Sequence, residues 1–243
     1  MVSPRFVYSL YESRLQKRLP KEDLPNHIGL IHDGHRRYAR RENLLSYEVS
    51  YKIGMVRFKE CLSWCEELGI SYVTSWLLSR ENLLRSEEEL ETYFVVLNEL
   101  FEELIIDDLV DNFKIQFIGS TDLLPDYLKE TITRLQEVRG GGEKTLTIAL
   151  GYGGRQEIID AIKSLVIENK GKDPEGLVEE INDEQIREHL YLPDAPDVDL
   201  VIRTSGESRL SGFSSLSDHK KNHQSKRLAH LKWGFPHRFI DSN

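Results

Sequence analysis

HIGLIHDGHRR, residues 27–37, is an apolar run that passes directly into a polar turn of glycine, histidine and arginine. Short apolar runs with such boundaries are typical of buried strands in a parallel sheet. The same kind of run recurs at residues 70–79, 114–119, 145–151 and 199–204. The sequence therefore predicts five strands that share one hydrophobic core.

The segments between these runs have apolar residues at helical spacing. The predicted helices cover about residues 48–68, 87–109, 125–139 and 156–168, and another precedes the first strand at about residues 4–19. The residues directly after the first strand are predicted to form a polar turn. Strands that alternate with helices at short spacing favour a largely parallel sheet. We therefore expect a single α/β domain, with a central parallel sheet flanked by helices.

The 243 residues carry a formal net charge of −9, and 39% of them are hydrophobic. That length and composition suffice for one domain with a buried core. No apolar run predicts a membrane-spanning helix, and the first residues lack the apolar core of a secretory signal. The two cysteines, Cys61 and Cys65, fit buried thiols in a reducing compartment. We expect a cytoplasmic protein, and its acidic body argues against general nucleic-acid binding.

Polar segments rich in arginine, glycine and hydroxyl side chains follow four of the predicted strands, at residues 33–37, 79–85, 151–155 and 203–209. Ligands of open parallel sheets bind beyond the carboxyl ends of the strands, so these segments should meet at one edge. Arginine forks bind phosphate oxygens in pairs, and a lone aspartate such as Asp33 suits Mg²⁺ shared with phosphate. The sequence therefore predicts a phosphate or diphosphate site.

Four stretches, in this order, resemble the signatures of cis-prenyltransferases, the family that contains undecaprenyl diphosphate synthases. They are HIGLIHDGHRRYAR, WLLSRENLLR, LTIALGYGGRQEI and DVDLVIRTSGESRLSGF. Together they span about residues 24–213, and the helical start looks most like archaeal and actinobacterial members. The resemblance implies a prenyltransferase that condenses an allylic prenyl diphosphate with isopentenyl diphosphate. Its product would be a cis-polyprenyl diphosphate, a precursor of isoprenoids or glycosyl carrier lipids.

The resemblance also implies a role for individual residues. Asp33 would hold Mg²⁺ on the allylic diphosphate, and Asn82, supported by Ser79, would help position the acceptor or remove its proton. These three are the catalytic candidates. The substrate-binding candidates are Gly34, His35, Arg36 and Arg37 for the allylic diphosphate, Arg203, Arg209 and Ser211 for isopentenyl diphosphate, and Arg85 as a support for the Asn82 loop. A homodimer is typical of the family, and the apolar product allows peripheral membrane contact.

Some positions depart from the family pattern. His35 replaces a common Asn, Tyr51 stands where many members have His, and Tyr47 falls near a position that is often Arg. Leu77 lies where long-chain synthases have a smaller residue, which favours a short product if it borders the product tunnel. An ordinary core role for Leu77 is the alternative.

The last thirty residues, 214–243, do not follow the family pattern, which continues with a strand, dimer contacts and a metal-binding Glu. They carry six Lys or Arg, two Asp or Glu and four His, and they show no strand pattern. We therefore expect a catalytic domain over residues 1–213 and an atypical, disordered basic tail over 214–243. A reading-frame change in the gene and a natural basic tail both explain it. With this tail, the alternative is a non-catalytic subunit, or an inactive homologue with an altered C-terminus, that supports a cis-prenyltransferase. A prenyltransferase with an unusual acceptor is a further alternative.

Overall fold

The computed structural model describes residues 20, 24–171, 181–206, 212–213 and 227–230 of the chain. The helix expected at residues 4–19 and the candidates Arg209 and Ser211 lie outside the described residues. No helix among the described residues is long and apolar enough to cross a membrane.

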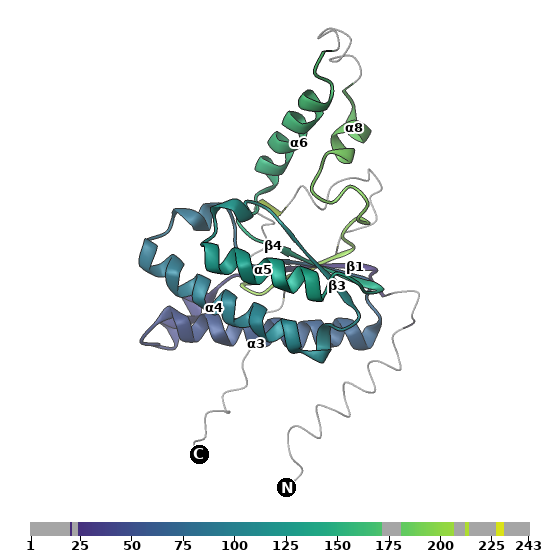
Figure 1. Cartoon of the computed structure of the whole chain (residues 1–243). Helices are drawn as coiled ribbons and strands as arrows, with labels where there is room; N and C mark the ends of the chain where they lie inside the picture. Colours follow the sequence, from purple (N-terminus) through teal and green to yellow (C-terminus); the bar gives the residue numbers. More distant parts are fainter. Residues whose placement is uncertain (1–19, 21–23, 172–180, 207–211, 214–226, 231–243) are drawn as a thin grey trace.

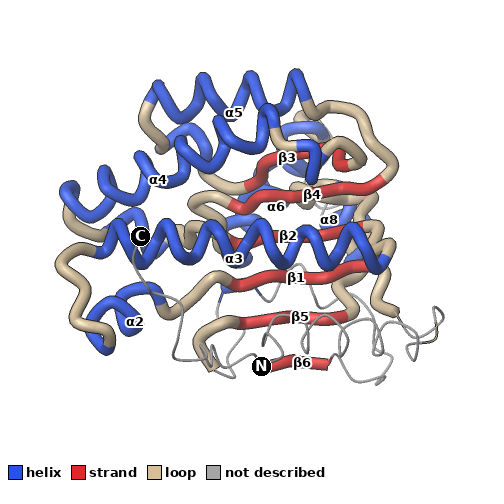
Figure 2. Tube along the Cα trace, turned by 90° about the horizontal axis from the view of Figure 1, so that it is seen from below, coloured by secondary structure: helices blue, strands red, loops and turns tan. Residues whose placement is uncertain are grey.

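A six-stranded parallel sheet forms the centre of the fold, in the spatial order β3-β4-β2-β1-β5-β6. The strands are β1 (His27–Ile31), β2 (Tyr72–Trp76), β3 (Phe113–Ile118), β4 (Lys144–Ala149), β5 (Leu200–Arg203) and β6 (Arg227–His230). The first five are the five predicted strands, and the predicted parallel α/β fold is confirmed. Because β1 lies between β2 and β5 and all three are parallel, their carboxyl ends lie at the same edge of the sheet (Figure 2). The segments that follow the three strands begin there.

The sixth strand corrects the prediction for the C-terminal segment. No strand was expected after residue 213, but Arg227–His230 pairs in parallel with β5. Among the described strands, β6 has a neighbour on one side only, so its sequence need not be patterned for burial on both faces as in an interior strand. The remainder of residues 214–243 lies outside the described residues.

Helices cover both faces of the sheet. They are α2 (His35–Arg41), α3 (Tyr47–Leu68), α4 (Glu87–Ile106), α5 (Asp126–Val138), α6 (Gly154–Glu168) and α8 (Asp183–Glu188). The helices α3, α4 and α5 lie side by side on one face, whereas α6 and α8 project from the other (Figures 1 and 2). α2 is a correction, because the sequence HRRYARR was predicted as a polar turn. It lacks apolar periodicity, and Ala39 is its one buried residue.

The main core lies between the sheet and the layer of α3 and α4. Phe58 and Leu62 of α3 and Leu97, Phe101 and Leu104 of α4 are completely buried there. Burial of such side chains stabilises a fold by roughly 1.5–3 kcal/mol each before entropy is counted. This packing fixes the first turn of α4 beside the start of α3, and both positions border the candidate site.

A smaller core on the opposite face holds the segment that follows β5. Phe213 is completely buried, and Trp76 at the end of β2 stacks on it with ring centroids 5.8 Å apart. A Cβ at position 29 would lie 2.8 Å from the Phe213 ring, so β1 needs a glycine there. Phe213 thereby anchors the end of the last signature stretch against β1 and β2.

Candidate active site

A cavity of about 590 Å³ lies at the carboxyl ends of β1, β2 and β5. Nine of the predicted site residues line it: Asp33, Gly34, His35, Arg36, Arg37, Ser79, Asn82, Arg85 and Arg203. The turn at residues 151–155, which was expected at the same rim, does not line this cavity, whereas Gly212 does. Residues from the three strand ends thus meet around one space, as the parallel sheet requires.

Asp33 occupies the turn between β1 and α2, and two arginines share its carboxylate. Arg203 Nε donates to Asp33 Oδ2 at 3.1 Å, its Nη2 donates to the same oxygen, and Arg37 Nη2 donates to it at 3.2 Å. Burial opposes ionisation of Asp33. Hydrogen bonds from Arg203 and Ser205 and the charges of both arginines outweigh it, so the pKa of Asp33 lies below its ordinary value. The carboxylate is therefore ionised at neutral pH.

The backbone of this turn is also fixed to β5. Thr204 Oγ1 donates to the carbonyl of Asp33 at 2.8 Å and accepts from the Asp33 N–H at 3.1 Å. Gly34 follows with a φ of 103°, which glycine adopts readily and other residues rarely adopt. These constraints place Asp33 at the cavity and start α2 immediately afterwards.

His35 is the first residue of α2, and its ring faces α3. A Cβ on Gly54 would lie 2.1 Å from His35 Cε1, so the ring packs against the α3 backbone. Nδ1 donates to the Ser50 carbonyl at 3.2 Å, and the buried Nε2 has no hydrogen-bond partner among the described residues. Burial is the main reason that the pKa of His35 is lowered. The neutral ring therefore joins α2 to α3, a role that sequence did not reveal.

The loop after β2 presents Ser79, Asn82 and Arg85 in a chain of contacts. The Asn82 N–H donates to Ser79 Oγ at 3.2 Å, as the predicted support by Ser79 requires. Arg85 Nη2 donates to Asn82 Oδ1 at 2.8 Å, and Arg85 Nη1 pairs with Glu89 Oε1 at 3.0 Å. The Asn82 side chain is therefore held by Arg85, which is held in turn by α4.

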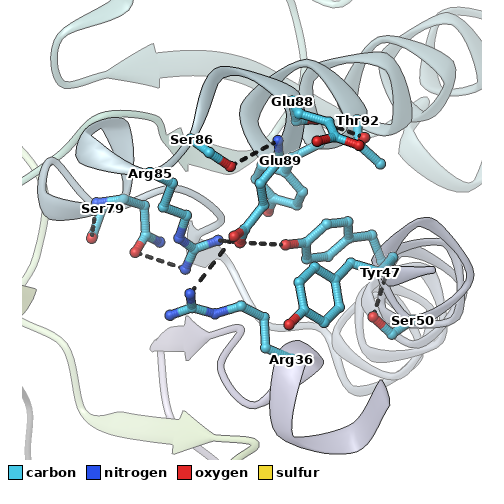
Figure 3. Close-up of polar contacts among 12 residues, drawn as sticks. Arg36, Tyr47, Ser50, Ser79, Arg85, Ser86, Glu88, Glu89 and Thr92 are labelled. Carbon is cyan, nitrogen blue, oxygen red and sulfur yellow. Dashed lines mark hydrogen bonds and ion pairs between the residues drawn. The ribbon is translucent and has the colours of Figure 1, made fainter. Parts of the chain in front are cut away.

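Glu89 lies behind the residues that line the site, and the sequence did not reveal it. It accepts a hydrogen bond from the Tyr51 hydroxyl at 3.0 Å and lies 3.7 Å from Arg36 Nη1. Figure 3 shows Arg36 and Arg85 directed toward this carboxylate from two different segments. The sequence carries no signal for the pair of Arg85 and Glu89, because Arg85 has extended backbone and lies before α4, which begins at Glu87. Tyr51, noted as a departure, has this carboxylate as its partner.

Large apolar and aromatic side chains form the inner wall of the cavity. Leu77 and Tyr93 line it and are each 3% exposed. The Tyr93 hydroxyl donates to the Leu77 carbonyl at 2.7 Å, and the Tyr93 ring meets the Tyr51 ring edge-on at 4.7 Å. An apolar inner wall below a cationic rim suits a ligand with an anionic head and a hydrocarbon tail.

Comparisons with known proteins found matches in both sequence and structure. The model of the family described as putative undecaprenyl diphosphate synthase matches residues 31–225. A tritrans,polycis-undecaprenyl-diphosphate synthase (geranylgeranyl-diphosphate specific) of Picrophilus torridus is 41% identical over 214 residues, which are 86% of this chain and 82% of the relative. A (2Z,6E)-farnesyl diphosphate synthase of Thermobifida fusca is 41% identical over 213 residues, which are 85% of this chain and 81% of the relative.

Among solved structures, the chain is similar to lavandulyl diphosphate synthase from Lavandula x intermedia, crystallised in complex with dimethylallyl diphosphate. The TM-score is 0.68 at 28% identity, and the match covers 78% of this chain and 81% of the other.

Proposed function

The chain belongs to the undecaprenyl diphosphate synthase family of prenyltransferases, and we propose that it condenses an allylic prenyl diphosphate with isopentenyl diphosphate to a cis-polyprenyl diphosphate. The observation that carries this proposal is the convergence of Asp33, Asn82, Arg85 and Arg203 on one cavity with an apolar inner wall. The relatives named above are synthases, so the alternative of a non-catalytic subunit gains no support from them.

Asp33 is the residue that we propose to hold Mg²⁺. No cluster of three potential metal-binding side chains exists among the described residues, so protein ligands alone would not hold the ion. A single ionised carboxylate fits Mg²⁺ all the same, because this ion commonly takes one or two carboxylates together with substrate phosphates. When bound, the ion would neutralise charge on the allylic diphosphate and so assist cleavage of its C–O bond.

The arginines would share the stabilisation of the two diphosphates. Arg36 and Arg37, with the backbone at Gly34 and His35, are proposed to bind the allylic diphosphate, whose departure builds up negative charge. Preorganised cations around such a leaving group lower the barrier electrostatically. Arg203, which is 8% exposed, is proposed to bind isopentenyl diphosphate. The family resemblance assigns Arg209 and Ser211 to the same diphosphate.

Asn82 is proposed to position the acceptor rather than to remove its proton. A carboxamide oxygen accepts hydrogen bonds but is not a base near neutral pH. Asn82 Oδ1 already accepts from Arg85 at 2.8 Å, which leaves its amide N–H groups as donors. Such a donor can orient a diphosphate oxygen of the acceptor while the double bond attacks the allylic carbon.

We propose a short or medium product. Leu77 and Tyr93 are buried side by side at the inner wall, where a growing chain would have to pass. The relatives include both a farnesyl and an undecaprenyl synthase, so membership of the family alone sets no length. Two bulky buried side chains at this wall support the shorter alternative, and the core role of Leu77 is compatible with it.

We further propose that the protein is a homodimer. It would act in the cytoplasm and contact the membrane peripherally through its apolar product. The apolar stripe Ile158, Ile159, Ile162 and Val166 of α6 supports the dimer, because each of these residues is more than 40% exposed. Exposed apolar stripes of this kind mark interaction surfaces. Replacement of Ile162 by Glu should leave a monomer in sedimentation equilibrium; an unchanged dimer would place the interface elsewhere.

The activity is tested with radiolabelled isopentenyl diphosphate, Mg²⁺ and geranyl, farnesyl or geranylgeranyl diphosphate as the allylic substrate. We expect butanol-extractable product that depends on both Mg²⁺ and the allylic substrate. Folded protein that forms no product with any of the three would contradict the proposed activity. The chain length of the product, read on the same samples, tests the short-product proposal separately.

A further inference from the structure

Glu89, in the first turn of α4, is a carboxylate shared by three side chains from other parts of the chain. It pairs with Arg85 at 3.0 Å, accepts from the Tyr51 hydroxyl of α3 at 3.0 Å and lies 3.7 Å from Arg36 of α2. Its side chain is 13% exposed. Figure 3 shows the two arginines approaching this carboxylate from separate segments. Glu89 thus ties together α2, α3 and the loop after β2.

The partners of Glu89 line the candidate active site, but Glu89 itself does not. Arg36, Tyr51 and Arg85 border the cavity of about 590 Å³. Glu89 borders a neighbouring cavity of about 750 Å³, together with Tyr47 and Glu88. The carboxylate therefore stands behind the side chains that face the substrates, so any effect of Glu89 on the reaction acts through them.

A carboxylate at this place is unfavourable for anion binding taken alone. Its charge repels a diphosphate in the adjoining cavity and competes for Arg36. An exposed ion pair contributes only about 0–1 kcal/mol to stability. Stabilisation of that size does not explain a carboxylate beside an anion-binding cavity. What Glu89 adds is order: it fixes Arg85, and Arg85 holds Asn82 Oδ1 at 2.8 Å.

We propose that Glu89 is a positioning residue that aligns the side chains for the allylic diphosphate with those for the acceptor. Through Arg85 it sets Asn82 for the acceptor, and through Arg36 and Tyr51 it fixes the allylic side of the cavity. This inference rests on the proposed function. It predicts that loss of the charge lowers turnover without weakening the binding of the allylic diphosphate.

The test replaces Glu89 by Gln, which keeps the shape and an acceptor for Tyr51 but removes the charge. Glu88→Gln is the matched control. Glu88 is exposed, lies in the same first turn of α4, and has no ion pair or hydrogen bond of its carboxylate among the described residues. Both variants lose the same favourable charge at the helix N-terminus, so that effect cancels.

We expect kcat of Glu89→Gln to fall at least tenfold, with the KM for the allylic diphosphate unchanged or lower. Glu88→Gln should keep both constants within twofold. A structural role would instead lower the melting temperature and raise the KM together. An unchanged kcat, or a loss of allylic affinity that follows a loss of stability, would overturn the inference.

A double-mutant cycle tests whether Glu89 acts through Arg85. If it does, the turnover loss of the double variant Arg85→Gln, Glu89→Gln should be smaller than the product of the two single losses, because the two effects share one interaction. A turnover loss in the double variant equal to the product of the two single losses would contradict an action of Glu89 through Arg85.

Hydrogen exchange separates this inference from the proposed function. The backbone of residues 79–86 should exchange faster in Glu89→Gln than in Glu88→Gln, while the rest of α4 is unchanged. This readout needs no turnover. A wild type that makes no product would refute the proposed function, whereas equal exchange in the two variants would refute the positioning role.

Discussion

Replacement of Arg203 by Ala should lower the free energy of unfolding and weaken acceptor binding, and the loss of stability should depend on pH. Arg203 makes two hydrogen bonds to Asp33 Oδ2. Its side chain is 10% exposed and that of Asp33 is 31% exposed, so the pair is partly shielded from water. Hydrogen bonds to charged groups contribute about 1.5–3 kcal/mol when buried. Arg37 still pairs with Asp33 in the variant, so we expect a loss of about 2 kcal/mol at pH 7.

The pH dependence follows from the pKa of Asp33, which lies below its ordinary value in the folded protein. A carboxylate with a depressed pKa stabilises the fold fully above the unfolded-state pKa. That contribution is lost as the pH falls through the folded-state pKa. Without Arg203 the depression shrinks. The difference in free energy of unfolding between wild type and Arg203→Ala should therefore be largest near pH 7 and should become smaller below about pH 4.

Urea unfolding followed by fluorescence at several pH values measures the stability difference, and kinetics at pH 7 measure the KM for isopentenyl diphosphate. We expect the KM to rise at least tenfold, because Arg203 is proposed to bind that diphosphate. Arg203→Lys should recover part of the stability but little of the affinity, since an ammonium group lacks the paired donors of a guanidinium. A stability loss that is the same at all pH values would refute the reasoning about Asp33. An unchanged KM would refute the proposed substrate role of Arg203.

Three further predictions test separate parts of the site. Asp33→Ala should abolish turnover in Mg²⁺ buffer while the protein stays folded by circular dichroism; turnover that survives would remove Asp33 as the metal ligand. Leu77→Ala should lengthen the product by one or more isoprene units in thin-layer analysis, and an unaltered product would leave Leu77 as ordinary core. Gly29→Ala should lower the free energy of unfolding by about 1–3 kcal/mol, because its Cβ would lie 2.8 Å from the Phe213 ring. No change in urea unfolding would mean that Phe213 moves away without cost.

Much of the fold could be predicted because its central strands β1, β2 and β4 are mostly buried on both faces. Such strands are rich in apolar residues, as residues 28–31 of β1 are, and that pattern is visible in the sequence. The position of the site follows from the same fact, since parallel strands bring residues 33–37, 79–85 and 203 to one edge.

The elements that the sequence did not predict depend on tertiary contacts. α2 has almost no apolar residues, and it is held by the His35 ring against Gly54 and by its arginines. β6 is a strand because its backbone pairs with β5. Backbone pairing does not depend on the side chains, so the sequence gives no sign of it. Glu89 looks like one of three acidic residues in a helical first turn, and three-dimensional placement alone distinguishes it from Glu88.

The arginines and carboxylates around the cavity form two similar units on either side of α2. Asp33 joins Arg37 of α2 to Arg203 at the end of β5, and Glu89 joins Arg36 of α2 to Arg85 after β2. Consecutive arginines of one short helix are thereby tied to two strand ends. Each unit carries one excess positive charge, so the site attracts anions although the protein is acidic overall.

The two units differ in what a bound substrate would do to them. Asp33 lines the cavity, so metal and diphosphate would compete for its pairs with Arg37 and Arg203. Glu89 lies outside the cavity, so its pair with Arg85 can persist through the reaction. Accordingly, substitutions at Asp33 should change the metal dependence of turnover. Substitutions at Glu89 should change kcat at a fixed metal requirement, and a shift in the Mg²⁺ dependence of Glu89→Gln would show that the two units are not independent.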